Sequence, residues 1–406
     1  MQSTVANTTA VVRSLGTSIS HQNGVALATA FSLLTQIPAD ALLHAVSVHN
    51  GVDGLFQDLD APYADFFSIY TRFITEPNIQ RPLRLDDVLK YFTKHIYTAA
   101  WHRPLFEAIC SFVVGQSLLL DDNLKKRGKS PVQCGLVQTA LNDFIRDCLR
   151  RVQAGSESGL LLAANAVFRM SFESGELHVC TTVISQIEMQ AGRVFNYTDF
   201  PKSDQVTYYY QIGKLKLRYH DFIMADHYLS HAAQLCTVQN FSAKRAILSY
   251  QIVARIVRGC LPSNQLLHKY NLSNQFSELV FHIRTGNHRA YMQALDRNSG
   301  WFMQRCAYMI MKERVKLLMY RNLFHSCFRI VQQAYPDKFN IHISIFTKAV
   351  EISGLSGDSV HNDEAECMIV SLIDQGYILG YVDHRTATVV LSKNRTFPRP
   401  LHAKRK

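Results

Sequence analysis

The C-terminal part of the chain carries the pattern that most constrains its fold. Two helical runs precede a third helix that opens with Asp363 and Glu364 and is closed by Gly376. Acidic residues suit the positive end of a helix, and glycine commonly ends one. Two short strands follow, at residues 377–382 and 388–391, with a loop of hairpin length between them. This order of elements predicts a winged helix.

The sequence upstream of this pattern reads as helical over most of its length. Apolar residues recur at spacings of three and four, and residues 132–330 keep this period almost throughout. One segment has the spacing of a tetratricopeptide unit, in which small residues let two antiparallel helices approach, although Lys216 replaces the second aromatic residue of that repeat. The matching positions are Tyr209, Ile212, Gly213, Ala225, Leu229 and Ala232. We therefore expect an all-α helical-repeat (tetratricopeptide-like) array followed by a C-terminal winged helix.

The composition suggests four segments along the chain. Residues 1–25 are polar and aperiodic and read as a loose N-terminal tail. The array is expected at 26–330, the winged helix at 331–398 and a basic C-terminal tail at 399–406. No run of about 18 uncharged apolar residues occurs, and the N-terminus lacks the apolar segment of a signal peptide. We therefore expect a soluble intracellular protein without membrane insertion.

The chain shows no pattern typical of a catalytic or metal site. Its nine cysteines include no C-x-x-C pair, and its 17 histidines form no H-x-H or H-E-x-x-H motif. No serine lies in a G-x-S-x-G motif. The basic cluster from Lys125 to Lys129 lacks the glycine pattern of a nucleotide-binding loop, which leaves a solvated loop or a phosphate contact. We expect a non-catalytic protein with no metal and no cofactor.

Positive charge is concentrated in the second half of the chain. The net charge is +11, and residues 201–406 hold 27 Lys and Arg against 14 Asp and Glu. This imbalance suggests an acidic partner, either nucleic acid or an acidic protein segment, although ordinary solubility charge would look similar.

The third helix of the winged helix is acidic, which argues against reading of duplex DNA. It contains Asp363, Glu364, Glu366 and Asp374 and no Lys or Arg, so the phosphates that line a groove would repel it. Basic residues flank this helix instead and predict contacts with phosphates of RNA or DNA that do not depend on sequence. These candidates are Lys316, Lys338, Lys348, Arg385, Lys393 and Arg395. Arg314 and Arg321 are expected either to bind a protein partner or to form internal salt bridges.

Several segments resemble the PCI-domain proteins. They are FPKSDQVTYYYQIGKL at 200–215, KRAIL at 244–248, ERVK at 313–316, YRNLF at 320–324 and DQGYILGYVDHRTATVVLSKNRTFP at 374–398. More narrowly, they resemble the PCI subfamily of transcription-coupled mRNA export and its signalosome-associated relative. The resemblance implies a non-catalytic scaffold in the nucleus, at the nuclear envelope, and also in the cytoplasm. The alternative is a signalosome-like or splicing-associated subunit that only binds proteins.

The resemblance also implies partners. One is a larger PCI-domain scaffold protein, and another is a small acidic disordered subunit shared with the proteasome lid, lying along the basic helices of residues 201–330. PCI winged helices commonly pair edge to edge, and an exposed strand can extend the sheet of a partner. Thr388, Val389, Val390 and Leu391 are the candidate strand, unless that strand only closes its own hairpin.

Overall fold

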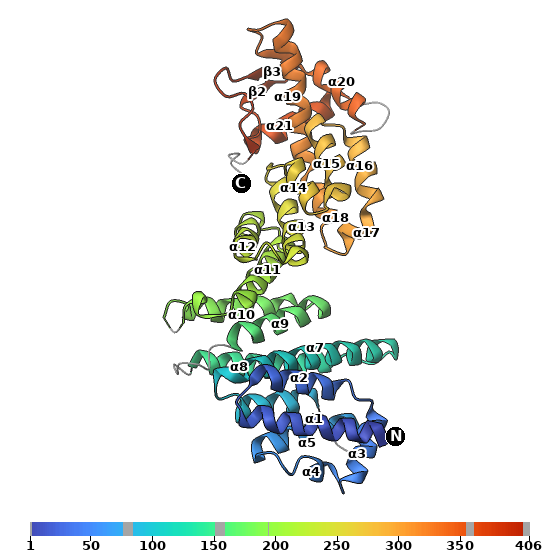
Figure 1. Cartoon of the computed structure of the whole chain (residues 1–406). Coiled ribbons are helices and arrows are strands. Elements are labelled where there is room, and N and C mark those ends of the chain that lie inside the picture. Colours follow the sequence, from blue (N-terminus) through green and yellow to red (C-terminus); the bar gives the residue numbers. More distant parts are fainter. Residues whose placement is uncertain (1, 76–83, 151–158, 194, 355–360, 401–406) are drawn as a thin grey trace. The chain divides into compact units, whose positions relative to one another are not determined.

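The computed structural model describes residues 2–75, 84–150, 159–193, 195–354 and 361–400 of the 406. The chain divides into two compact units, residues 1–211 and 212–406 (Figure 1). Residues 401–406, most of the expected basic tail, lie outside the described residues. Both units are helical, and the described strands belong to one small sheet near the C-terminus. The expected fold class, a helical array that ends in a winged helix, is therefore confirmed.

The first unit is built from helices that pack on their neighbours in the chain. α1 contacts α2, α7 contacts α8, and α8 contacts α9. Its elements are α1 (Gln2–Ser20), α2 (Gly24–Thr35), α3 (Ala39–Val48), α4 (Val52–Leu55), α5 (Ala61–Thr75), α6 (Leu85–Tyr91), η1 (Phe92–Ile96), η2 (Ala100–His102), α7 (Arg103–Lys126), α8 (Gln133–Arg150), α9 (Leu160–Ser174), α10 (Leu177–Gln190), η4 (Tyr197–Asp199) and the first part of α11 (Lys202–Arg218).

The expectation of a loose N-terminal tail is wrong. Residues 2–20 form α1, which packs against α2 and α3. Thr8, Val12, Leu15 and Ile19 are buried and lie on one face of the helix, because their spacings are three and four residues. Exposed residues such as Arg13 and Thr17 lie between them and interrupt the stripe in the sequence.

α7 forms the centre of the first unit. Its buried side chains, among them Leu105, Phe106 and Val113, pack against α2, α8 and α9. Within the described residues, η2 and α7 together form the one continuous helix long and apolar enough to cross a membrane, and the bent pair α2 and α3 also meets that test when taken together. Because α7 packs against α2, α8 and α9, its apolar residues are those of a central helix in a helical bundle.

The second unit begins within α11 and continues with helices that pack in consecutive pairs. α12 packs against α13, and α15 packs against α14, α16 and α19. The elements are α12 (Phe222–Leu235), α13 (Phe241–Val257), α14 (Asn264–Lys269), α15 (Ser273–Thr285), α16 (His288–Arg297), α17 (Ser299–Met303), α18 (Tyr308–Arg314), α19 (Lys316–Ala334), β1 (Asn340–His342), α20 (Ile343–Ser353), α21 (Asn362–Asp374), β2 (Gly380–Asp383) and β3 (Thr388–Leu391).

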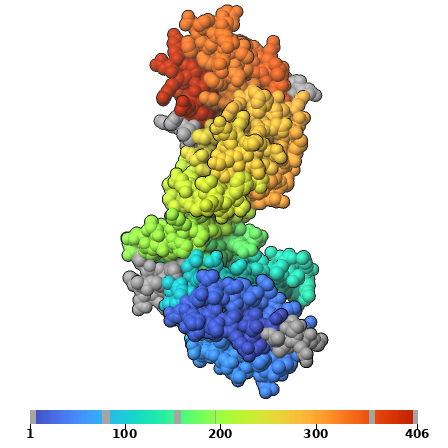
Figure 2. All heavy atoms as spheres, in the orientation of Figure 1, coloured from blue at the N-terminus to red at the C-terminus, as the bar shows by residue number. Residues whose placement is uncertain are grey.

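Two hydrophobic cores fill the second unit, and α19 contributes to both. Leu318 and Met319 belong to the core of the array helices, whereas Leu323 and Phe324 belong to the core of the winged helix. In the space-filling view, the orange and red atoms of the winged helix lie directly against the yellow atoms of the array (Figure 2). The expected boundary at residue 331 therefore falls inside a helix that both parts share.

Candidate nucleic-acid interface

The winged helix is positioned by local signals that the sequence supplies. The His342 side chain accepts a hydrogen bond from Ser344 N and so caps α20. Thr347 on α20 donates to the Asn362 side chain at the start of α21 at 2.8 Å, which links the two helices. Gly376 adopts the left-handed conformation, with φ of 73°, that glycine tolerates better than other residues. These contacts fix the start of α20, the link between α20 and α21, and the end of α21.

The sheet has the strand order β1-β3-β2, and both pairings are antiparallel. Val389 lies opposite Ile341 on one side and Val382 on the other. The expectation that Thr388, Val389, Val390 and Leu391 offer a strand edge to a partner is therefore wrong. Both edges of β3 already carry strands, so a partner strand would have to pair with β1 or β2. The sequence did not reveal this because β1 is only three residues long and reads as the first turn of α20.

The outer face of the sheet, turned away from the helices, is lined by Asn340, Val390 and Tyr381 in one row across the strands. Val389 and Leu391 are buried on the inner face, so Val390 between them points outward. Tyr381 lies opposite Val390 and has 62% of its surface exposed. The sequence reasoning did not select Tyr381, although its place in an alternating strand was a usable signal.

The turn after β3 closes back on β2 and places two of the candidate cations. Ser392 N donates to Leu379 O at 2.8 Å, and Leu379 N donates to Thr396 O at 3.0 Å. Lys393 and Arg395 are exposed within this closed turn. Lys338 reaches the same end of the sheet, because Leu391 N donates to Phe339 O and so aligns Lys338 with the start of the turn. Lys338, Lys393 and Arg395 therefore surround one end of the sheet, and we call them the basic end.

Two other candidate cations lie elsewhere on the winged helix. Arg385 is exposed at the wing tip, where its backbone N and the Thr386 hydroxyl donate to Asp383. The length of β3 separates the tip from the basic end by about 10–13 Å. Lys348 is exposed on α20. Among the described residues, neither these two side chains nor those of the basic end form an ion pair.

Lys316 does not share this surface. Its ammonium forms a salt bridge with Glu313 at 3.0 Å, at the first residue of the 19-residue helix α19. Lys338 of the basic end follows the last residue of α19, roughly 27 Å from Lys316 along the helix axis. Arg395 lies two residues before Phe397, whose ring contacts the middle of α19. Arg314, also near this start, is exposed in the last turn of α18. The structure thus divides the predicted phosphate contacts into separate groups.

Arg321 holds the C-terminal segment onto α19. Its guanidinium donates to Phe397 O at 3.3 Å and to Pro398 O at 3.0 Å. The Phe397 ring packs on His325 and Phe328 of the same helix. Burial lowers the pKa of Arg321. The structure thus gives Arg321 internal bonds, to backbone carbonyls rather than to the carboxylate of an internal salt bridge.

The acidic third helix is confirmed, and one of its carboxylates faces the wing. Glu366 on α21 lies 3.0 Å from the Nδ1 atom of His384 at the wing tip. This hydrogen bond, together with the negative charge of Glu366, raises the pKa of His384. The surface around α21 therefore favours cations over phosphates.

The array helices of the second unit hold a charged cluster that the sequence reasoning missed. Asp226 on α12 pairs with Arg255 at 2.8 Å and with Arg258. Gln251 donates to Ser230 at 2.8 Å beside them. These residues adjoin or line a cavity of about 280 Å³ that also includes Leu261 and Leu266. Part of the positive charge of residues 201–300 is therefore used within the array.

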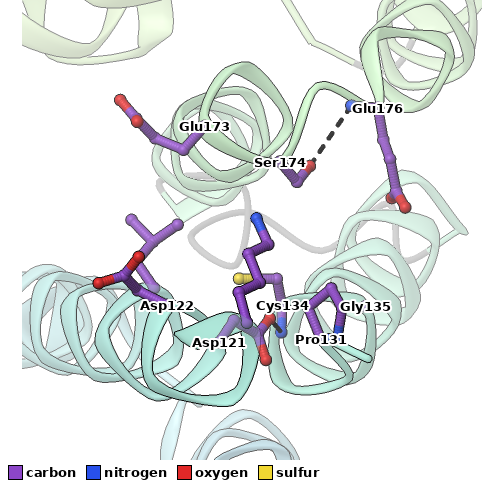
Figure 3. Close-up of a pocket in the computed structure, with 10 residues that line it drawn as sticks. Asp121, Asp122, Pro131, Cys134, Gly135, Glu173, Ser174 and Glu176 are labelled. Atoms are coloured by element: carbon purple, nitrogen blue, oxygen red, sulfur yellow. Dashed lines mark hydrogen bonds between the residues drawn. The ribbon is translucent and has the colours of Figure 1, made fainter. Parts of the chain in front are cut away.

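A larger cavity of about 390 Å³ lies in the first unit between α7, α8, α9 and α10. Figure 3 shows Glu173, Ser174 and Glu176 on one side of it, facing Asp121 and Cys134 on the other. Asp121 accepts hydrogen bonds from the backbone N atoms of Val132, Gln133 and Cys134 at 2.8–3.0 Å and so caps α8. Burial opposes ionisation of Asp121, but these amide bonds outweigh it and lower its pKa.

The cavity does not form a metal site. In the described ranges, no three His, Cys, Asp or Glu side chains are grouped so that they could hold a metal ion. Lys125, from the basic cluster predicted as a loop, lies in the last turn of α7 and lines this cavity, and Lys126 pairs with Asp122 at 2.6 Å.

Comparison with known proteins agrees with this architecture. Residues 295–393 match the PCI domain family. The chain contains a PCI domain. The matched region begins at residue 295, upstream of α18 and α19. It therefore includes α19, the helix that contributes to the cores of both the array and the winged helix.

Several known proteins resemble the chain over more than the PCI domain. The chain is 29% identical to PCI domain-containing protein 2 of Xenopus laevis, over 84% of this chain and 86% of the relative. It is 28% identical to Enhanced ethylene response protein 5 of Arabidopsis thaliana, over 75% and 71%. It is 31% identical to the PCI domain-containing protein 2 homolog of Drosophila melanogaster, over 59% and 58%. The similarity to PCI domain-containing protein 2 thus extends beyond the PCI domain to most of the chain.

Proposed function

We propose that this protein is a non-catalytic scaffold subunit of a transcription-coupled mRNA-export complex that contacts nucleic acid through phosphates. The observation that carries the proposal is the distribution of charge on the winged helix. The basic end, Lys348 and Arg385 are exposed and form no ion pair with any described residue, while α21 is acidic. Unpaired cations at a protein surface release counterions from a phosphate backbone, and this release drives binding without base readout.

The same proposal includes two protein partners. A larger PCI-domain scaffold would pair with the winged helix, and a small acidic subunit would lie along the array helices of residues 201–330. The excess of 12 Lys and Arg over 5 Asp and Glu in residues 201–300 suits an acidic, disordered ligand. The complex would act in the nucleus at the nuclear envelope. Affinity purification from its own cells tests this part, and recovery of neither partner would count against it.

Charge reversal tests the phosphate contacts directly. Lys338, Lys348, Arg385, Lys393 and Arg395 would each be changed to Glu, and binding to a single-stranded RNA would be measured at two salt concentrations. Loss of each phosphate contact should reduce the salt slope of log affinity by roughly 0.7. Lys316→Glu is the matched control, because Lys316 lies at the first residue of α19 and already pairs with Glu313. Unchanged affinity and slope in all five variants would contradict the proposal.

A second candidate function is a module that binds only proteins, as in a signalosome-like or splicing-associated complex. The observation that favours it is an apolar stripe on α20, where Ile352 is 88% exposed and Ile345, two turns away, is 38% exposed. Ile352→Asp would then abolish co-purification of the partner, whereas the charge reversals would leave it unchanged. Nucleic-acid binding that depends on the basic end would favour the first function.

A further inference from the structure

The outer face of the winged-helix sheet combines an exposed aromatic ring with an adjoining group of cations. Tyr381 stands in the middle of β2, and Leu379, two residues earlier, is 39% exposed on the same side. Val390 lies beside Tyr381 on β3 and is half-buried. Single exposed apolar residues are common on protein surfaces, but these three adjoin one another on a flat support.

The backbone of the closed turn fixes the cations relative to this apolar patch. Leu379 is hydrogen-bonded to both Ser392 and Thr396, and the Thr396 hydroxyl donates to Ser392 O at 2.8 Å. Lys393 and Arg395 are therefore held next to Leu379, about 7 Å along the strand from Tyr381. Lys338 is held at the same end, because Gln332 Nε2 donates to Lys338 O at 2.8 Å.

The opposite end of the face has a different character. Its row contains His342, Thr388 and Asp383, and the Asp383 carboxylate accepts hydrogen bonds from Thr386 and from Arg385 N. A phosphate would meet there one carboxylate and one cation, Arg385. At the basic end it would meet three cations that form no ion pair with a described residue, although the Lys338 ammonium lies 5.2 Å from the centre of the Tyr335 ring. Charge complementarity thus gives a bound polyanion one favoured side of the face.

We propose that the outer face of this sheet is a stacking platform for single-stranded nucleic acid, with one base on the Tyr381 ring and its neighbouring phosphates at Lys338, Lys393 and Arg395. This inference rests on the proposed phosphate contacts and adds the base contact and the strandedness. Exposed aromatic rings on a sheet bind unstacked bases, which a duplex does not present. The preference for single strands comes from stacking of a base on the Tyr381 ring. The affinity for any polyanion comes from the cations of the basic end.

Two probes separate the ring from the cations. One is an oligouridylate of about 12 nucleotides, and the other is an abasic oligomer of the same length and charge. Binding of the full chain to each would be measured by fluorescence anisotropy. Tyr381→Ala should weaken oligouridylate binding roughly ten-fold and leave abasic binding unchanged, because stacking contributes about 1–3 kcal/mol per base. Tyr381→Phe should bind like the wild type, because stacking uses the ring rather than the hydroxyl.

The controls separate failure of this inference from failure of the proposed function. Tyr219→Ala removes another tyrosine, 50% exposed in the array, and should change neither affinity. Lys393→Glu should weaken binding of both probes. Unchanged oligouridylate binding in Tyr381→Ala, with weaker binding of both probes in Lys393→Glu, would overturn the platform and leave the phosphate contacts intact. Absence of salt-dependent binding to either probe would overturn both. Loss of a co-purifying protein in Tyr381→Ala, with RNA affinity unchanged, would show a protein-binding face instead.

Discussion

Gly213 on α11 lies directly against Leu229 on α12, because a Cβ atom added at Gly213 would sit 2.5 Å from Leu229 Cγ. Leu229 and the flanking Ala225 and Ala232 are fully buried. The tetratricopeptide-like spacing in the sequence predicted this close approach of two helices, and the structure confirms it. The glycine is required here by the packing between the helices rather than by its backbone conformation.

Gly213→Ala should therefore destabilise the second unit. Overpacking costs about 1–3 kcal/mol, and the gain of up to about 1 kcal/mol in helix propensity only partly offsets it. Gly115→Ala is the matched control, since Gly115 is also inside a helix, α7, and a Cβ there would meet nothing within 4 Å. The control should be neutral or stabilising in urea unfolding monitored by circular dichroism. Equal stability of wild type and Gly213→Ala would mean that the two helices can separate at little cost.

Arg321→Ala should release the C-terminal segment from α19. The variant loses the donors to Phe397 O and Pro398 O, which are half-buried, so the loss should cost about 1 kcal/mol or somewhat more in total. Local opening should rise roughly ten-fold, since about 1.4 kcal/mol corresponds to that factor. Limited trypsin digestion followed by mass spectrometry would detect faster cleavage after Lys393 and Arg395. Arg329→Ala, an exposed position on the same helix, should leave the rate unchanged; equal rates in both variants would contradict the role of Arg321.

Asp121→Asn should reduce the stability of the first unit and its dependence on acid pH. The folded-state pKa of Asp121 is lowered, so its ionised form stabilises the fold above the unfolded value of about 4. That stabilisation is lost as the pH falls through the folded-state pKa. Charge-assisted bonds to three amides suggest a loss of about 1.5–3 kcal/mol near neutral pH. Urea unfolding from about pH 6 to about pH 3 would show it. Asp122→Asn, on the exposed side of α7, is the control and should keep the wild-type pH profile.

Glu366→Gln should lower the pKa of His384. Glu366 raises this pKa in the wild type, so the pair stabilises the wing fully below the ordinary value of about 6.5. The contribution is lost as the pH rises through the higher folded-state pKa. An NMR titration of the His384 ring should show its pKa falling toward the ordinary value of about 6.5 in the variant. A titration of His384 that the substitution leaves unmoved would show that the carboxylate does not contact the ring in solution.

The sequence predicted the elements whose ends carry local signals. Gly376 and the acids Asp363 and Glu364 marked the ends of α21, and the run from Thr388 to Leu391 has the bounds of β3. These features depend on residues close together in the chain, so short-range preferences are enough to predict them.

The missed features depend on contacts between distant segments. β1 becomes a strand because Asn340, Ile341 and His342 pair with β3, which follows them by more than forty residues. The environment of Arg321 depends in the same way on carbonyl groups at Phe397 and Pro398. Spacing alone does not report such pairings, so the sequence could not show that β3 is paired on both edges or decide between the two roles expected for Arg321. The stripe of α1 is different, since Val12, Leu15 and Ile19 were visible in the sequence.

The helix α19 has a consequence for how the PCI domain can be divided or inherited. A fragment that begins after this helix would lose Leu323 and Phe324 from the core of the winged helix, including the contact between the Phe324 and Phe346 rings. The winged helix should therefore unfold cooperatively with the preceding helices. It does not fold as an independent domain in this chain. Recombination that exchanged the winged helix between proteins would have to carry α19 with it.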